Sequence, residues 1–197
     1  MASTEMSIDI PPPEASVESR LRDFSGWRSL NDSIMGGSSQ AGCRVGPEGL
    51  FLEGELIEEG GGFVSCRSPK LMPALDLSAY QGLQLEVDGE GRTLKLAIAS
   101  RDGVFGLTER IPGGLRWVAP IPTNASGTTI IDIPFASLQA TVRAKPAPLP
   151  FRSLRFDPSG ISQLQLLHSK FNESGELNPG FRPGQIRILL RCIRAVH

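Results

Sequence analysis

Short apolar runs bounded by turn-forming residues constrain the fold of this chain more than any other feature of its sequence. In the segment 82–89, GLQLEVDG, the residues Leu83, Leu85 and Val87 alternate with polar residues, and 92–100, RTLKLAIAS, repeats the pattern. Alternation with a period of two residues is typical of strands that bury one face. The intervening sequence DGEGR is rich in turn formers, so the two segments are predicted to form a hairpin.

Seven further segments have strand character, and glycines and prolines are spread between them. These segments are 49–57, 62–68, 104–111, 115–123, 128–135, 161–169 and 185–196. No long amphipathic stretch predicts a helix, although SVESRLRDF at 16–24 predicts one short helical turn capped by Ser16 or Ser19. The proline-rich segment 143–160 is predicted to be a surface loop. About nine short strands separated by turns indicate an all-β sandwich or barrel.

The 197 residues suit one folded domain, preceded by a tail. Residues 1–18 are polar and contain three consecutive prolines, which predicts a flexible N-terminal tail, with the domain over 19–197. The tail lacks the basic segment followed by an apolar run that is typical of a secretory signal, and it lacks the acid-poor composition of a transit peptide. No apolar stretch approaches the roughly 20 residues that a bilayer span requires. We therefore expect a cytoplasmic protein, or one attached to a membrane through a partner and not inserted in it.

Charge and cysteine content restrict the classes of ligand. The formal net charge is −1, so the chain as a whole has no general attraction for nucleic acid or anionic lipid. Cys43, Cys66 and Cys192 lie far apart and form no CxxC pair, which argues against a zinc site. An odd number of cysteines, spread far apart along the chain, predicts reduced thiols, most of which are expected to be small buried side chains.

The sequence predicts no catalytic residue, metal or cofactor. It contains neither a nucleophile elbow nor a phosphate-binding loop, and its two histidines are His168 and the C-terminal His197. We interpret His168 as a polar residue near the end of a strand and not as a catalytic base. Trp27 and Trp117 are predicted to contribute to packing, which weakens a carbohydrate-binding or single-strand-binding interpretation.

Two stretches combine adjacent glycines with aromatic and polar residues within a few positions, WRSLNDSIMGGSSQ at 27–40 and EEGGGFVSCR at 58–67. We name them the dense stretches. Their glycines allow positive φ angles or close approach of strands, and Asn and Asp side chains can fix turns by accepting from backbone amides. A guanidinium group could lock the two stretches together by pairing with an acid, and Arg67 is the candidate partner for Asp32. The cluster either holds the fold or forms a groove or edge that receives a partner segment by strand addition. The candidate binding residues here are Asn31, Asp32, Met35, Gly36, Gly37, Gly61, Gly62, Phe63 and Arg67.

A second group of candidate binding residues lies in the proline-rich loop. Its members are all basic: Arg143, Lys145, Arg152 and Arg155. They make the loop a candidate contact element, either for a protein or for RNA.

The two dense stretches, followed by DLSAYQGLQLEVDGEGR at 76–92 and DIPFASLQATVR at 132–143, resemble the complex I intermediate-associated protein family over about 24–196. The sequence departs from that family's pattern in the turn at 89–91, which is Gly-Glu-Gly, and at Leu94 and Ala144. The resemblance implies a jelly-roll β-sandwich of the galactose-binding-domain-like type and no catalysis.

On this resemblance we expect a non-enzymatic assembly or accessory factor. It would bind a protein subunit or an intermediate of an NADH-dehydrogenase-like complex, or of a photosynthetic membrane complex during photosystem biogenesis at the thylakoid. Two alternatives stay open. One is an RNA-binding, translation-linked factor for a photosystem subunit, and the other is a carbohydrate-binding module.

Overall fold

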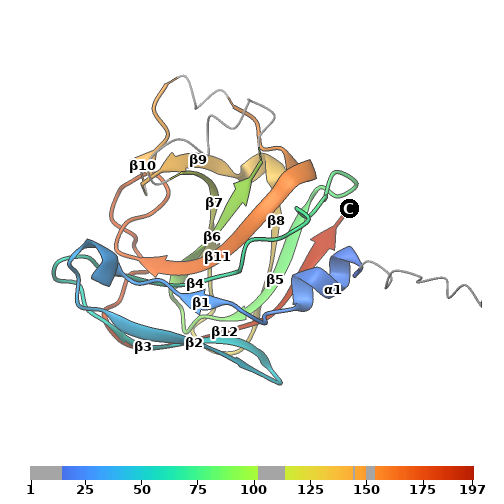
Figure 1. Cartoon of the computed structure of the whole chain (residues 1–197). Helices are drawn as coiled ribbons and strands as arrows, with labels where there is room; N and C mark the ends of the chain where they lie inside the picture. The colour runs from blue at the N-terminus through green and yellow to red at the C-terminus, as the bar shows by residue number, and fades with distance from the viewer. Residues whose placement is uncertain (1–14, 102–113, 144, 150–153) are drawn as a thin grey trace, which may run out of the picture.

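Two antiparallel sheets packed face to face form the body of the protein (Figure 1). The computed structural model describes residues 15–101, 114–143, 145–149 and 154–197. The seven-stranded sheet has the order β1 (Arg28–Ser29), β4 (Phe63–Arg67), β11 (Ile161–Ser169), β6 (Thr93–Ser100), β7 (Leu115–Pro122), β9 (Gln139–Val142) and β10 (Lys145–Pro146). The five-stranded sheet has the order β2 (Gln40–Gly46), β3 (Gly49–Leu56), β12 (Gly184–Val196), β5 (Gly82–Asp88) and β8 (Thr129–Pro134). The predicted all-β sandwich is confirmed.

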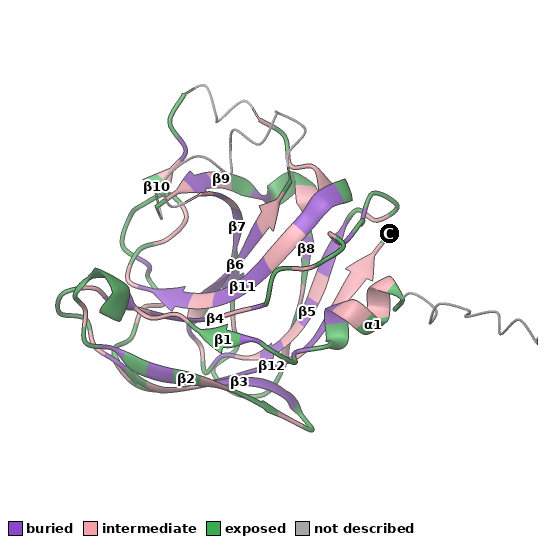
Figure 2. Ribbon diagram, viewed as in Figure 1, coloured by how far each residue is buried: buried purple, intermediate pink, exposed green. Residues whose placement is uncertain are grey.

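The core lies between the sheets and follows the alternation in the sequence (Figure 2). On β5, Leu83, Leu85 and Val87 are fully buried, as are the alternate residues Leu94, Leu96 and Ile98 of β6. In β12 the pairing with β5 shifts between Leu190 and Cys192. The alternation of inward-facing and outward-facing residues therefore shifts by one position along β12, and Ile193 is fully buried.

A short helix packs beside β12 at one end of the sandwich (Figure 1). This helix, α1 (Val17–Arg22), starts as predicted at Ser16, whose Oγ accepts a hydrogen bond from the Ser19 amide at 3.2 Å. It includes the last two residues of the predicted tail, of which residues 1–14 lie outside the described part of the chain. Three 3₁₀ turns complete the described helices: η1 (Asp32–Met35), η2 (Phe135–Ser137) and η4 (Pro158–Gly160). None of the described helices is long and apolar enough to span a membrane.

The sequence missed four strands, β1, β2, β9 and β10. β1 and β10 contain two residues each, and β2 and β10 are the edges of their sheets. Only one residue of β2, Ala41, is buried, so the strand carries little of the apolar alternation that sequence analysis detects. The strand predicted at 104–111 lies outside the described residues.

The prediction of reduced thiols is wrong for two of the three cysteines. Cys43 on β2 and Cys66 on β4 form a disulfide, with their Cα atoms 5.9 Å apart, whereas Cys192 is free and buried. The bond connects one sheet to the other. Spacing along the chain could not reveal it, because β2 and β4 belong to different sheets and face each other only after the sandwich has formed.

Candidate functional site

A buried carboxylate joins the two dense stretches of the sequence. Asp32 in η1 is 0% exposed. Its Oδ2 accepts hydrogen bonds from the Gly62 amide at 2.7 Å, the Ser39 hydroxyl at 2.7 Å and the Phe63 amide at 3.3 Å. Its Oδ1 accepts from the Ser39 amide at 3.0 Å. Both oxygens of the carboxylate are thus occupied by neutral donors.

The predicted pairing of Asp32 with Arg67 is wrong. Asp32 binds amides at the first residue of β4, whereas Arg67 is the last residue of that strand, about 13 Å further along at the usual rise per residue. Burial acts to raise the pKa of Asp32, but the hydrogen bonds from Ser39, Gly62 and Phe63 outweigh it and hold this pKa below its usual value. The carboxylate is therefore charged at neutral pH without a cationic partner.

The glycines of both stretches permit close packing against this carboxylate. A Cβ atom on Gly37 would lie 2.4 Å from the Asp32 Cγ, and one on Gly61 would lie 2.5 Å from the Asp32 Cβ. Gly36, at the end of η1, has a φ of +89°. Asn31 donates from Nδ2 to the Ala41 carbonyl at 2.8 Å. We name this cluster of residues 31–39 and 60–63 the Asp32 junction, and its observed contacts hold the fold.

Beside the junction, a cleft of about 710 Å³ extends over the outer face of the seven-stranded sheet. Its floor includes a row of residues that pair in register across four strands: Arg67 on β4, Gln165 on β11, Ala97 on β6 and Val118 on β7. The small side chain of Ala97 lies near the middle of this row.

The Asp32 junction forms one wall of the cleft. Ile34 and Met35 of η1 line it and are 64% and 66% exposed, and Phe63 lies at the start of β4. Asn172 and Glu173, which follow β11, also line the cleft. The arrangement gives an apolar rim above a more polar floor.

The cleft is strongly cationic although the whole chain is not. Among the described residues of its lining are Arg67, Lys95, Arg116 and Arg143 and a single acid, Glu173, while the formal net charge of the chain is −1. Among the ion pairs between described residues, none includes the first three of these cations.

These three cations donate hydrogen bonds to uncharged acceptors. Arg67 donates from Nη2 to the Gln165 Oε1 at 3.3 Å, and its buried Nε has no partner. Lys95 donates from Nζ to the Phe171 carbonyl at 2.6 Å, and Arg116 donates from Nη1 to its neighbouring Leu115 carbonyl at 2.9 Å.

Burial of these cations shows in their pKa values. It lowers the pKa of Lys95 to about 8, against the opposing influence of Glu173. Burial also lowers the pKa of Arg67, and burial together with the charge of Arg67 lowers that of Arg116. All three side chains are protonated at pH 7. They are partly desolvated positive charges that form no ion pair with a described residue, which is the arrangement of an anion-binding surface.

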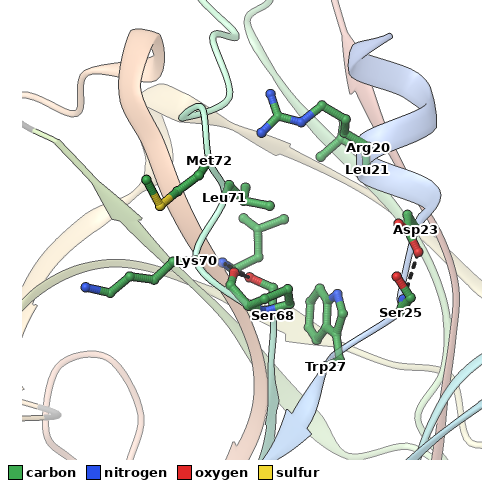
Figure 3. Close-up of a pocket in the computed structure, with 11 residues that line it drawn as sticks. Arg20, Leu21, Asp23, Ser25, Trp27, Ser68, Lys70, Leu71 and Met72 are labelled. Atoms are coloured by element: carbon green, nitrogen blue, oxygen red, sulfur yellow. Dashed lines mark hydrogen bonds between the residues drawn. The ribbon is translucent and has the colours of Figure 1, made fainter. Parts of the chain in front are cut away.

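A smaller cavity of about 210 Å³ lies between α1 and the segment 68–72 (Figure 3). Trp27 stands in its wall and is 8% exposed. Asp23 accepts from the Ser25 amide at 2.8 Å, and Arg20 donates to the Pro73 carbonyl. The second contact joins α1 to the segment that follows β4. Trp117 is also buried, so both tryptophans contribute to packing, as predicted.

The predicted binding residues thus divide into groups. Met35, Phe63, Arg67 and Arg143 line the cleft, whereas the remaining residues of the first group build the Asp32 junction. Lys145 and Arg155 are exposed outside the cleft lining, and Arg152 lies outside the described residues.

The polar cleft residues that sequence reasoning missed include Lys95, Arg116 and Gln165. Lys95 lies on the face of β6 opposite the core residues, so the alternation contained a signal for it. It did not indicate that this outer face is recessed.

His168 belongs to the interior. It is 0% exposed, its Nδ1 lies 3.0 Å from the Thr93 carbonyl, and burial lowers its pKa to about 4. The imidazole is therefore neutral at pH 7 and donates from Nδ1 to that carbonyl. Within the described part of the chain, no three His, Cys, Asp or Glu residues are grouped as metal ligands.

Solved structures with a similar fold are carbohydrate-active proteins. A family 11 carbohydrate-binding module of the cellulosomal cellulase Lic26A-Cel5E of Clostridium thermocellum is 17% identical, with a TM-score of 0.57 over 89% of this chain and 92% of that one. The family 11 module from the same organism, in complex with a β-1,3-1,4-mixed-linked tetrasaccharide, is also 17% identical, with a TM-score of 0.58 over 88% and 92%. The agarase AgWH50C is 11% identical, with a TM-score of 0.50 over 81% of this chain and 22% of the agarase. The fold is accordingly a jelly-roll sandwich of the galactose-binding-like type, as predicted.

Comparison of the sequence itself identifies a family. No curated protein matches the chain at a significant level. One family does, complex I intermediate-associated protein 30 (CIA30), over residues 16–189, which include both dense stretches, the Asp32 junction and every residue of the cleft lining. With most of its length matched, the chain belongs to the complex I intermediate-associated protein 30 family.

Proposed function

We propose that this protein is a non-enzymatic assembly or accessory factor, which binds a protein subunit or an assembly intermediate of a membrane electron-transfer complex. The observation that carries the proposal is the family match over residues 16–189, because the family is named for association with a complex I intermediate. An NADH-dehydrogenase-like complex is the first candidate partner. A photosynthetic complex, bound during photosystem biogenesis at a thylakoid, is the second. In both cases the protein would act on the soluble face of the membrane.

The geometry suits a binding role. The cleft floor consists of paired strands, and the Asp32 junction fixes the wall that carries Ile34 and Met35. A surface held in this way loses little conformational entropy when a partner binds. Among the described residues, no histidine lines the cleft and no His, Cys, Asp or Glu residues cluster as metal ligands, which favours recognition over catalysis.

The experiment is a pull-down with the tagged protein from detergent-solubilised membranes of its native host, followed by mass spectrometry. We expect sub-stoichiometric recovery of several subunits of one electron-transfer complex. A parallel bait replaces Arg143, Lys145, Arg152 and Arg155 with alanine, and loss of the subunits from this bait would place the contact on the basic loop. Recovery of RNA and ribosomal proteins without subunits of such a complex would contradict the proposal.

Carbohydrate binding is a second candidate, favoured by the similarity to a module solved with a mixed-linked tetrasaccharide. Among the described residues that line the cleft, Phe63 is the one aromatic side chain, and none is a tyrosine or tryptophan. Sugar sites usually depend on aromatic platforms, so this lining disfavours the candidate. Affinity electrophoresis in gels containing β-1,3-1,4-mixed-linked glucan decides the matter, because retarded migration requires binding.

An RNA-binding role is the third candidate. Of the four basic residues in the predicted loop, Arg143, Lys145 and Arg155 are described and exposed. Contacts with phosphates would make the affinity for RNA fall steeply with salt concentration. Titration with a uridine oligonucleotide at increasing potassium chloride concentrations tests this candidate.

A further inference from the structure

We propose that the cleft on the seven-stranded sheet is the partner-binding site, and that it receives an acidic segment of the partner protein with a carboxylate seated over Arg67 and Arg116. An apolar side chain of the same segment would lie against Ile34, Met35 and Phe63. This inference deepens the proposed function and rests on the partner being a protein.

The first argument is the charge on the cleft floor. Four cationic side chains and one carboxylate line the cleft, and Arg67, Lys95 and Arg116 form no ion pair with another described residue. The remaining cation, Arg143, adds its charge at the turn after β9. Partly buried cations of the same sign raise the free energy of the unbound cleft, and an anion between them relieves both repulsion and desolvation.

The second argument is an unused hydrogen-bond donor. The Nε of Arg67 is buried and has no acceptor, while Nη2 of the same guanidinium contacts only the neutral Gln165 Oε1. A carboxylate accepts two parallel hydrogen bonds from the Nε and Nη edge or the Nη pair of a guanidinium. Arg116 on β7 lines the same cleft as Arg67, and burial together with the charge of Arg67 lowers its pKa, so both guanidinium groups act on an anion in the cleft. The cleft therefore provides donors in the number and charge that a carboxylate requires.

The third argument is the apolar rim. Ile34 and Met35 are 64% and 66% exposed on a short 3₁₀ turn that the Asp32 junction holds in place. Large exposed apolar side chains beside a concave surface mark protein-binding sites. A volume of about 710 Å³ lies within the roughly 300–1,000 Å³ of ligand-sized pockets, so it accommodates a few residues of a chain and not a folded domain.

The combination of rim and floor selects a peptide over the other anions. RNA binding without base readout depends on stacking of successive bases on aromatic side chains. Phe63 is the one aromatic side chain among the described residues of the lining. An acidic peptide has both the carboxylates for the floor and the aliphatic side chains for the rim.

Photo-crosslinking tests the inference directly. Met35 is replaced with p-benzoylphenylalanine in the full chain, and the tagged protein is irradiated in solubilised host membranes. The matched control carries the same group at Ile130, which is 63% exposed on β8 of the other sheet. We expect the Met35 probe alone to give a specific product, whose crosslinked peptide, by mass spectrometry, is rich in Asp and Glu and contains aliphatic residues.

A second pair of variants tests the role of charge. Arg67→Gln combined with Arg116→Gln, in the Met35-probe background, should reduce the crosslink yield at least about tenfold, because the charge-assisted hydrogen bonds to the carboxylate are lost. Arg44→Gln combined with Arg187→Gln removes the same charge from β2 and β12 of the other sheet and should leave the yield unchanged. Thermal unfolding of each variant establishes that it folds.

The outcomes separate this inference from the proposed function. If the unmodified protein recovers subunits of a complex but the Met35 probe crosslinks to none of them, the cleft inference is overturned and the proposed function stands. If the Met35 probe crosslinks to an acidic segment of a protein from no electron-transfer complex, the proposed function fails and the cleft specificity stands. Equal yields from the cleft and control charge variants, crosslinks to segments poor in acidic residues, or crosslinks to RNA would each overturn the cleft inference.

Discussion

Replacement of Asp32 with asparagine is the sharpest test of the Asp32 junction, because it keeps the shape of the side chain and changes its charge and hydrogen-bonding pattern. The wild-type carboxylate accepts four hydrogen bonds, three at Oδ2 and one at Oδ1. Asparagine has a single acceptor oxygen. Its best orientation keeps the oxygen in the place of Oδ2 and turns the amide NH₂ toward the backbone N–H of Ser39.

The cost of this substitution follows from the hydrogen bonds that are lost. One hydrogen bond to a charged group disappears, at about 1.5–3 kcal/mol, and the buried Ser39 amide is left without an acceptor, at about 1–3 kcal/mol. The three remaining hydrogen bonds become neutral and weaker. We therefore expect the free energy of unfolding to fall by about 3–5 kcal/mol. For a chain of this size the midpoint of thermal unfolding should fall by roughly 6–20 °C.

Urea denaturation at pH 7, followed by tryptophan fluorescence, measures the difference. Asp76→Asn is the matched control, because Asp76 is exposed and accepts from the Ser78 amide at 2.9 Å in a turn that asparagine also favours. Its effect should stay within about 0.5 kcal/mol.

The pH dependence gives a second measurement on the same pair. The pKa of Asp32 is lower in the folded protein than in the unfolded chain, so the unfolded chain binds the proton more readily. The stability that this carboxylate contributes is complete above about pH 3.8 and is lost as the pH falls through the folded pKa. The difference between wild type and Asp32→Asn should shrink in acid. A loss below about 1 kcal/mol at pH 7, or an equal loss in the control, would refute the assignment of Asp32 as the anchor of the junction.

Three further predictions concern the rest of the described fold. Burial lowers the pKa of His168 to about 4, so stability should fall by on the order of 3 kcal/mol between pH 6.5 and 4, and His168→Gln should flatten this slope in urea titrations. Gly37→Ala should lower the free energy of unfolding by about 2–3 kcal/mol, because its Cβ would clash with the carboxylate of Asp32. Gly36→Ala should lower it by about 1 kcal/mol, because Gly36 has open space around it but a positive φ, and calorimetry of both variants compares the two effects. Non-reducing peptide mapping should find Cys43 linked to Cys66, and Cys43→Ser should cost about 3 kcal/mol in urea titrations, given the separation of 23 residues.

Local patterns in the sequence were sufficient for the architecture. The alternation in β5 and β6 assigned inward faces that the structure confirms, and Ser16 was correctly proposed as the helix cap. These properties depend on residues close together in the chain, where periodicity and capping chemistry act. The glycines of the dense stretches were correctly expected to serve positive φ angles or close packing, since few other causes require adjacent glycines.

The functional surface depended on contacts that no local pattern contains. Period-two alternation states which side chains share a face, but not which strands become neighbours or where a sheet is recessed. The strand order β4-β11-β6-β7 brings Arg67, Lys95 and Arg116 into one cleft, although these residues are far apart along the chain. Likewise, the acceptor role of Asp32 toward the amides of residues 62 and 63 arises only when the two dense stretches meet.

The sequence by itself determined the class of fold, the inward faces of its strands and the family resemblance, because each is written in residues that are neighbours or follow a fixed period. The tertiary structure alone decided that Cys43 bonds to Cys66 across the two sheets and that Asp32 binds backbone amides and not Arg67. It also decided that the guanidinium group of Arg67 lies in a cationic cleft. The physical reason is the same in the three cases. Pairing between distant segments is selected by the free energy of the whole packed sandwich, and no single segment contains that information.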